Sequence, residues 1–578
     1  MSAKKYRKSR NIGAVISLML MSQTGHGDWT PPVPGQVHNQ GPIVIRNVRV
    51  FDGIHGGLIE NATVLIDYIR MPDTQSGTGE TILGYDVGYF IREVAQGKPL
   101  KTPYDAGKAR VIDGQNKVLM PGLIDTHVHL SWANVTHLIG FATKLNEPGS
   151  GLTFRDWQVD DKRDPADPSF IPNAIHATKQ EAAANLMRGF TSVREVGGIA
   201  AKVRRDLNPH ETLIDPTNKK GPKQLVLSEP GPRIWAAGAV ISSTAGHADG
   251  QTELASRFHL FKDPDVMTAI EREDLILQLD QFGLRTADGV AGVQKAVRDQ
   301  FVKDVDLIKI TTGGGILSPH DPIDATTFSG DEVSAAVQVA QGYNTYVTTH
   351  AYNGDTIIRD ISRGVRMIEH ADLLTDAAAR MVKRKESKTD ADGRNIGPWL
   401  GISAFFDNEY ADQQEGPKID KQKQVQEGAL KAYALAKKYK LKHVGWGSDV
   451  MFQMTGGTNT PKIIAHLPVD LAPLKHWKND KGKLVNYAYS NFDILKMITA
   501  NNGQVLTLSG PRTPYLGANG HYLQEGDIGV IREGAVADLL LVEGNPLQSL
   551  NMFYDTDKNL LMIMKDGVIY KNNLPGNP

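Results

Sequence analysis

The sequence predicts an α/β protein in which a parallel β/α barrel is flanked by one small β domain made from both ends of the chain. Both ends of the 578-residue chain alternate apolar and polar residues, whereas the middle alternates short apolar strands with helical patterns. Strand–helix repetition favours a parallel sheet, and an eight-fold barrel takes about 250 residues. The excess length therefore lies in insertions, which we expect at residues 146–172, 208–232 and 386–421.

The β domain is predicted in two parts, residues 43–120 and residues 509–572. The second part ends in a hairpin, because Asp566-Gly567 is a two-residue turn signal between apolar runs. The expected strands of both parts cover residues 43–50, 61–67, 109–113, 537–542, 560–565 and 568–570.

The barrel is predicted over residues 121–508. Its strands are short apolar runs, and its helices are longer segments with a helical apolar period. The expected strands cover residues 191–194, 307–310, 346–349, 367–369 and 444–446, and the expected helices cover residues 174–188, 330–341, 356–363 and 424–438.

Composition excludes several classes of function. The formal net charge is −1, and no block of like charge follows the first ten residues, so nothing predicts nucleic acid as a partner. The chain has no cysteine, which removes thiol nucleophiles, disulfides and cysteine-based zinc sites. Any metal ion must therefore be bound by nitrogen and oxygen ligands.

The N-terminus has the pattern of a signal peptide, predicted over residues 1–27. Basic residues precede an apolar stretch, Ile12 to Met21, which is shorter than the roughly 20 residues that span a bilayer. We expect secretion or a periplasmic location, with no stable membrane span after removal of this segment. The alternative is a cytoplasmic protein with a basic tail.

The strongest chemical signal is a pair of histidines that closes an apolar run. His127 and His129 are two residues apart, and on a strand such residues point to the same side. Both imidazoles can therefore bind one metal ion. Asp125 and Thr126 lie beside them, and we expect these two side chains to fix the ring tautomers.

Four further candidate ligands end or lie in apolar strands. They are Lys309, His350, His370 and Asp449. A lysine in an apolar strand is unusual, because burying an ammonium without a partner is costly. One interpretation is a structural ion pair, and the other is a neutral amine that has reacted with CO2 and bridges two metal ions.

These motifs resemble the amidohydrolase superfamily, in the branch of imidazolonepropionase-related enzymes, Xaa-Pro dipeptidases and ochratoxin-cleaving amidases. The similarity extends over residues 43–572. It rests on Pro121-Gly122-Leu123-Ile124-Asp125-Thr126-His127-Val128-His129, Gly189-Phe190-Thr191-Ser192-Val193-Arg194-Glu195-Val196-Gly197-Gly198, Gly231-Pro232-Arg233, Ile308-Lys309-Ile310-Thr311-Thr312-Gly313-Gly314, His350-Ala351-Tyr352, Ile368-Glu369-His370 and Glu533-Gly534-Ala535-Val536-Ala537-Asp538-Leu539.

The resemblance implies a distorted (β/α)8 TIM barrel with a small β-sandwich, and two divalent metal ions, expected to be zinc. One ion would be bound by His127, His129 and Asp449, and the other by His350 and His370. A CO2-derived carbamate on Lys309 would bridge them.

The expected reaction is cleavage of an amide or peptide bond by hydroxide that bridges the two metal ions. Asp449 would accept the proton and pass it to the leaving nitrogen. Tyr352 is expected either to donate a hydrogen bond to the oxyanion or to pack at the barrel mouth.

Three further residues are candidate substrate contacts. His247 and His320 lie in loops rich in glycine and serine, where a structural role is the alternative. Arg194 is a candidate anchor for a substrate carboxylate. Its neighbour Glu195 favours a structural ion pair inside the barrel instead.

The predicted enzyme is thus a metal-dependent hydrolase of C–N bonds in a small substrate, a dipeptide or an N-acyl amino acid. Two alternatives lie within the same superfamily: a cyclic amide, imide, urea or lactone hydrolase, and a deaminase. A third is a non-catalytic scaffold, against which the complete ligand set counts. A homo-oligomer is also expected.

Overall fold

The computed structural model describes residues 41–70, 87–132, 174–204, 206–207, 210–213, 223–226, 229–251, 268–318, 320–390, 395–402, 417–449 and 460–575. The predicted signal peptide and the insertion at residues 146–172 lie outside this part of the chain, as do parts of the other two insertions. Among the described residues, no helix is both long and apolar enough to cross a bilayer.

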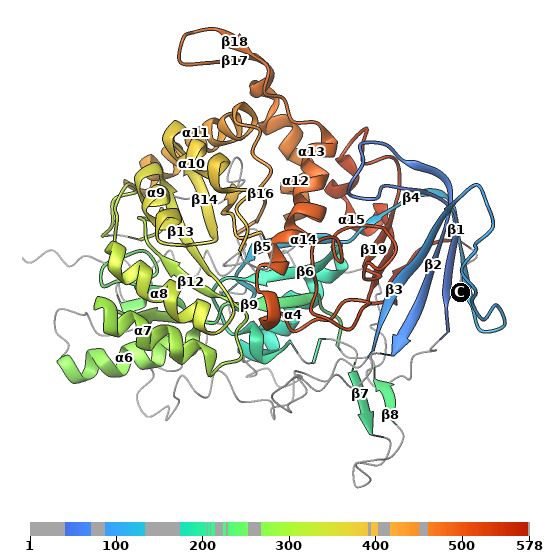
Figure 1. Ribbon diagram of the computed structural model, residues 1–578, viewed down its shortest axis with the longest axis horizontal. Helices are drawn as coiled ribbons and strands as arrows, with labels where there is room; N and C mark the ends of the chain where they lie inside the picture. Colours follow the sequence, from blue (N-terminus) through green and yellow to red (C-terminus); the bar gives the residue numbers. More distant parts are fainter. Residues whose placement is uncertain are drawn as a thin grey trace, which may run out of the picture.

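Strands from both ends of the chain form one seven-stranded sheet in the order β21-β20-β19-β4-β1-β2-β3. The two ends meet where β4 pairs antiparallel with β19, with Leu119 opposite Leu541. The strands are β1 (Ile43–Val50), β2 (Ile59–Arg70), β3 (Val87–Gln96), β4 (Arg110–Pro121), β19 (Leu539–Val542), β20 (Leu560–Lys565) and β21 (Val568–Asn572). Strands from the two ends of the chain thus share one sheet, which lies at the right of Figure 1.

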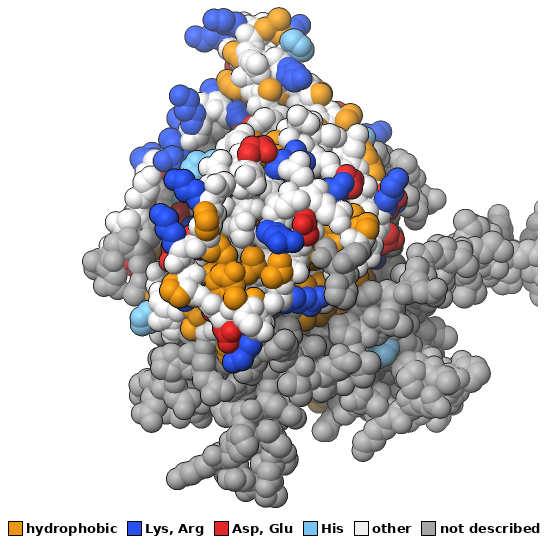
Figure 2. All heavy atoms as spheres, turned by 90° about the vertical axis from the view of Figure 1, so that its right-hand side faces the viewer, with side chains coloured by type: hydrophobic (Ala, Val, Ile, Leu, Met, Phe, Trp, Pro, Cys, Tyr) orange, Lys and Arg blue, Asp and Glu red, His pale blue; other side chains and the backbone are white. Residues whose placement is uncertain are grey.

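Local sequence explains the turn between β20 and β21. Asp566 and Gly567 both have positive φ, 55° and 69°, as the predicted Asp-Gly hairpin turn requires. Figure 2 shows the side of the molecule where this sheet lies, with a group of apolar side chains among basic and acidic ones.

The middle of the chain forms two parallel sheets, which confirms the predicted α/β class. One has the order β5-β6-β9 and the other the order β11-β10-β12-β13-β14-β15-β16. The strands are β5 (Leu123–Val128), β6 (Phe190–Glu195), β9 (Arg233–Ala236), β10 (Val240–Ser242), β11 (Leu284–Thr286), β12 (Ile308–Thr311), β13 (Val347–Asn353), β14 (Met367–Leu373), β15 (Trp399–Ile402) and β16 (Val444–Gly445).

Backbone hydrogen bonds connect the two parallel sheets at both ends. The amide of Asp306, just before β12, donates to the carbonyl of Ala236 in β9 at 2.8 Å. The amide of Asp449, after β16, donates to the carbonyl of His127 in β5 at 2.8 Å. The first and last strands of the region thus lie next to each other, although more than 300 residues separate them.

Helices follow most of the parallel strands, as Figure 1 shows. Three consecutive helices begin at capping residues: Ser329 and Glu332 form a capping box at the first, and Asn353 and Thr375 cap the next two. The helices are α4 (Ala174–Met187), α6 (Ala269–Phe282), α7 (Gly289–Phe301), α8 (Gly330–Gly342), α9 (Gly354–Ser362), α10 (Asp376–Lys385), α11 (Pro417–Lys438), α12 (Thr460–Asp470), α13 (Asn491–Lys496) and α14 (Asn502–Thr507).

Candidate metal centre

The first group of predicted ligands meets where β5 and β16 end. Nε2 of His127 lies 3.2 Å and Nε2 of His129 lies 3.3 Å from Oδ1 of Asp449. All three side chains are nearly inaccessible to solvent, and their ligand atoms lie within 4.8 Å of one another. The three residues predicted for the first metal position are therefore brought together.

The geometry of this group fits a tetrahedral metal ion. Nitrogen and oxygen ligands about 2.0–2.1 Å from zinc lie about 3.3 Å apart, which matches the two distances to Asp449. Oδ1 of Asp449 is buried and accepts no hydrogen bond of good geometry from the described residues, although both imidazoles are close. A buried oxygen without a donor is costly unless something else binds it.

The imidazoles are oriented by partners on their other nitrogens. Nδ1 of His127 lies 3.2 Å from Oε2 of Glu369, and Nδ1 of His129 lies 2.9 Å from the carbonyl oxygen of Gly197. A proton on each Nδ1 would leave both Nε2 atoms as acceptors directed at Asp449.

The expectation that Asp125 and Thr126 fix the ring tautomers was wrong. Oδ1 of Asp125 accepts the backbone amides of His127 and Ser448, each at 3.0 Å. Thr126 donates its hydroxyl to the carbonyl of Trp446 at 2.8 Å. Both side chains therefore join β5 to the segment after β16, and the hydrogen bonds they form are to backbone atoms and not to the imidazole rings. Burial raises the pKa of Asp125 to about 6.

Asp449 is ionised and strained. Burial opposes its charge, but His127 and the other nearby imidazoles lower its pKa well below the usual range. Its φ is 52°, in the left-handed region, and its amide is fixed by the carbonyl of His127. His370 also has a positive φ, 73°. Strained backbone of this kind concentrates at functional sites.

The second group consists of His350 on β13 and His370 on β14. These strands are neighbours, and the two ring centroids lie 4.3 Å apart. Burial lowers the pKa of both imidazoles well below 6.5, which keeps them in the neutral form that binds metals. Nε2 of His350 lies 3.1 Å from the carbonyl oxygen of Gly314, so a proton there would leave Nδ1 as the ligand atom.

Lys309 lies on β12 beside β13, and its charge acts on His127, His350 and His370. It is 2 % exposed and makes no ion pair with a carboxylate among the described residues. Burial lowers its pKa to about 8. This favours the interpretation of Lys309 as a reactive amine over the structural ion pair.

The two groups adjoin each other, because the rings of His127 and His370 lie 4.9 Å apart. Tyr352 lies next to the second group, with its ring 4.9 Å from those of His350 and His370. Burial raises the pKa of Tyr352 well above 10, so the phenol keeps its proton and can donate a hydrogen bond.

The candidate substrate residues are placed differently from one another. The ring of His247 lies 4.2 Å from that of His350, so this residue borders the centre. His320 is exposed and makes no contact with the cluster in the part of the chain that is described.

Arg194 is fully buried, and each of its guanidinium nitrogens already has an acceptor. These are the carbonyl of Thr126, the hydroxyl of Tyr346 and, at 2.5 Å, a carboxylate oxygen of Glu369. The expected ion pair is therefore formed with Glu369 and not with Glu195. This geometry favours a positioning role for Arg194 over contact with a substrate.

Glu369 is the functional residue that sequence reasoning missed. It contacts His127, Arg194 and the hydroxyl of Thr348. Burial opposes ionisation of Glu369, but Arg194 and His127 lower its pKa below the usual range, so it stays a carboxylate. Its place directly before His370 in the strand was the signal that could have identified it.

Comparison with known proteins agrees with this arrangement. Residues 118–395 match the Amidohydrolase family. The ochratoxinase of Aspergillus niger is 24% identical over 460 residues, which cover 78% of this chain and 76% of that protein. Residues 118–395 thus match the family that the resemblance predicted.

Solved structures support the same fold. The crystal structure of an amidohydrolase has a TM-score of 0.62 and 26% identity, covering 92% of this chain and all of that one. The structure of A. niger ochratoxinase has a TM-score of 0.61 and 20% identity, covering 93% of this chain and 97% of that one. The structure of a Xaa-Pro dipeptidase with methionine in its active site has a TM-score of 0.61 and 21% identity, covering 92% of this chain and all of that one. Together with the match to the Amidohydrolase family, the curated relative supports the predicted class of enzyme, a hydrolase acting on C–N bonds.

Proposed function

We propose that this chain is a binuclear metal-dependent amidohydrolase that cleaves an amide or peptide bond in a small substrate, a dipeptide or an N-acyl amino acid. The observation that carries the proposal is the convergence of the two ligand groups around a buried lysine, Lys309, with which no described carboxylate forms an ion pair. The names of similar proteins, ochratoxinase and Xaa-Pro dipeptidase, support the substrate class.

The ligand set fits two zinc ions. His127, His129 and Asp449 would bind one ion, His350 and His370 would bind the other, and Lys309 as a carbamate would bind both. Imidazole and carboxylate ligands suit zinc, and the partners on the far ring nitrogens are those of metal-binding histidines. When bound, such ions polarise a carbonyl and make hydroxide available near neutral pH.

The residues of the chain then have separate roles. Asp449 is ionised and can accept a proton and return it to the leaving nitrogen. Tyr352 is protonated and donates a hydrogen bond to the developing oxyanion. Arg194 keeps Glu369 ionised, and Glu369 orients His127.

The proposal includes the finer architecture. The backbone hydrogen bonds at both seams support a closed barrel over residues 121–508 in which β5, β6, β9, β12, β13, β14, β15 and β16 are the eight strands. The terminal sheet would curl into the small β-sandwich of residues 43–120 and 509–572. In such a barrel the ligands lie on the strands or shortly after them, and barrel enzymes bind their substrates at the carboxyl ends of the strands.

A hydrolysis panel tests the proposed function. The full chain, loaded with zinc in bicarbonate buffer, would be assayed on Xaa-Pro dipeptides, other dipeptides and N-acyl amino acids. We expect release of the amine from one of these classes, and loss of that release in Lys309→Ala. Turnover of only lactones, ureas or cyclic imides would replace the substrate class. A wild-type protein that binds no metal and hydrolyses nothing would contradict the proposal.

A further inference from the structure

The loop after β12 forms one wall of the centre. Its Gly314 carbonyl accepts Nε2 of His350 at 3.1 Å. Its apolar side chains Ile316 and Ile323 pack with Tyr352 and with Val425 of α11. The orientation of one predicted metal ligand therefore depends on where the described residues of this loop, 313–318 and 320–323, lie.

Lys421, in the second turn of α11, binds the tip of this loop. Its ammonium donates to three carbonyl oxygens, those of Gly315 at 3.0 Å, Ser318 at 3.0 Å and Asp321 at 2.5 Å. An ammonium has three donors and no acceptor, so three converging carbonyls satisfy it completely. Gly315 is the residue directly after the one that contacts His350.

A hydrogen bond within the loop also stabilises its fold. The amide of Gly315 donates to Oδ2 of Asp321 at 2.7 Å, which brings together two of the residues whose carbonyls Lys421 binds. The ammonium thus lies where the loop folds back on itself. Without it, the carbonyl of Gly315 would keep only the hydroxyl of Ser318, at 3.3 Å, and the carbonyls of Ser318 and Asp321 would lose the one donor that the described residues give them. Repulsion among the three carbonyls would then open the turn.

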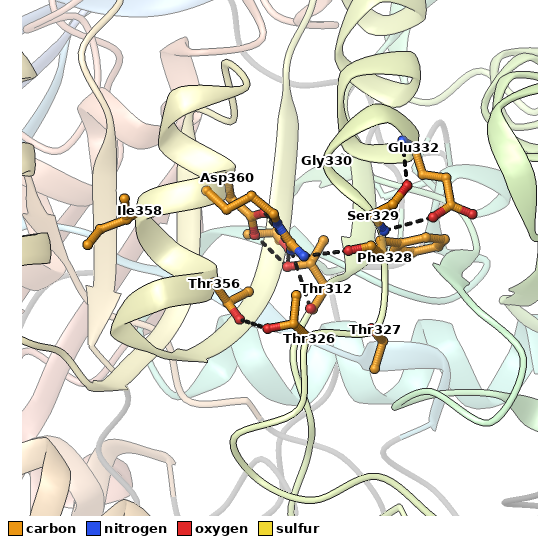
Figure 3. Close-up of polar contacts among 12 residues, drawn as sticks. Thr312, Thr326, Thr327, Phe328, Ser329, Gly330, Glu332, Thr356, Ile358 and Asp360 are labelled. Carbon is orange, nitrogen blue, oxygen red and sulfur yellow. Dashed lines mark hydrogen bonds and ion pairs between the residues drawn. The ribbon is translucent and has the colours of Figure 1, made fainter.

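The residues that flank the loop, Thr312 on one side and residues 326–328 on the other, form its base. This base is attached to a different helix, α9, as Figure 3 shows. Arg359 donates to the carbonyls of Phe328 and Thr312, and the hydroxyls of Thr326 and Thr356 lie 2.9 Å apart. Removal of Lys421 therefore leaves the base in place and releases the tip next to Gly314.

We propose that Lys421 is a positioning residue for the second metal position, acting through the loop whose Gly314 carbonyl orients His350. This inference rests on the proposed function for its metal, and on the contacts of the loop for the rest. The first metal position receives its orienting contacts from Glu369 and Gly197, so Lys421 affects the two positions unequally.

The test is zinc titration of the metal-free full chain against a competing chelator, using Lys421→Met, Lys421→Arg and the control Lys423→Met. Lys423 is exposed on the same helix. The second position has fewer protein ligands than the first, so we assign the weaker zinc step to it. In Lys421→Met we expect this weaker step to lose about 10–100-fold in affinity, as after loss of an orienting partner, while the tighter step stays unchanged. Lys421→Arg should lie between, because a planar guanidinium fits three converging carbonyls less well, and Lys423→Met should match the wild type.

The inference would be overturned if both zinc affinities of Lys421→Met equalled those of the wild type, or if both affinities fell by the same factor. Hydrogen exchange of the loop separates its failure from that of the proposed function. If the wild type binds no zinc, the proposed function fails, and faster exchange at residues 314–321 in Lys421→Met still supports the attachment of the loop. Unchanged exchange at those residues would overturn that attachment as well.

Discussion

The two halves of the candidate metal centre are built in different ways. His127, His129 and Asp449 come from strands far apart in sequence that are joined through the backbone by Asp125. His350 and His370 come from neighbouring strands, and one of them is oriented by a loop that a distant lysine holds. The first half is thus fixed by the sheet and the second by a loop, so the second should be the easier to disturb.

Loss of the Asp449 carboxylate should have the largest effect and break the first half. In Asp449→Asn we expect kcat/KM to fall by about 10²–10⁴, because the proton acceptor and one ligand are lost together. Steady-state hydrolysis at saturating zinc measures this, with exposed Asp324→Asn as control. Full turnover in Asp449→Asn with metal bound would exclude Asp449 as the proton acceptor.

The second half can be tested at Tyr352 without removing a ligand. Tyr352→Phe keeps the ring beside His350 and His370 but deletes the hydroxyl. We expect kcat to fall by about 10²-fold with KM and zinc content little changed, since an oxyanion donor acts in the transition state. Half-buried Tyr487→Phe is the control. An unchanged kcat in Tyr352→Phe would assign the residue to packing.

Asp125 tests whether the backbone joint fixes the first half. Asp125→Ala removes the acceptor of two buried amides, which we expect to cost about 1–3 kcal/mol of unfolding free energy for each amide left without a partner. The tighter zinc step should weaken more than the other. Asp125→Asn keeps an acceptor oxygen and should stay near wild type in both denaturant melts and zinc titration; a loss as large as that of alanine would argue for the charge instead.

Glu195 should produce the smallest effect, seen as a pH dependence of stability. Its buried carboxylate accepts the amides of Ser131 and Ala200 without a cation, and burial raises its pKa from 4.5 to about 7. Between these values the folded state binds more protons than the unfolded state, so stability falls as pH rises from about 4.5 to about 7. Glu195→Gln should remove this slope, by at most about one proton, from urea unfolding curves measured across that window. A slope that Glu195→Gln leaves intact would contradict the assignment.

Much of this arrangement could be predicted, because the end of a strand is marked by a pattern of neighbouring residues in the sequence. Apolar runs with a following polar residue placed His127 and Asp449 at or near the ends of β5 and β16, and the apolar run around Lys309 placed this residue within β12. Helix α8 was predicted within one residue, since its capping signal is also local. The strand at Trp399–Ile402 was missed, because four residues that include Gly401 show no period.

Contacts made across the fold could not be read from the chain. Lys421 stands among polar residues at the start of a helix and has the sequence pattern of a surface lysine, yet its partners lie about 100 residues earlier. Thr126 was expected to fix the imidazole tautomers, but its hydroxyl donates to the carbonyl of Trp446, directly after β16 and more than 300 residues away. The role of such side chains depends on which strands become neighbours, and sequence pattern does not encode that.

The central claim is a two-ion centre with separable halves, and elemental analysis of zinc per chain tests it most directly. The full chain would be loaded with zinc and bicarbonate, then dialysed, as wild type, His129→Asn and His350→Asn. The account predicts about two equivalents for the wild type and about one for each variant, with hydrolysis lost in both. A wild-type chain that retains no zinc, or variants that retain two equivalents, would contradict it.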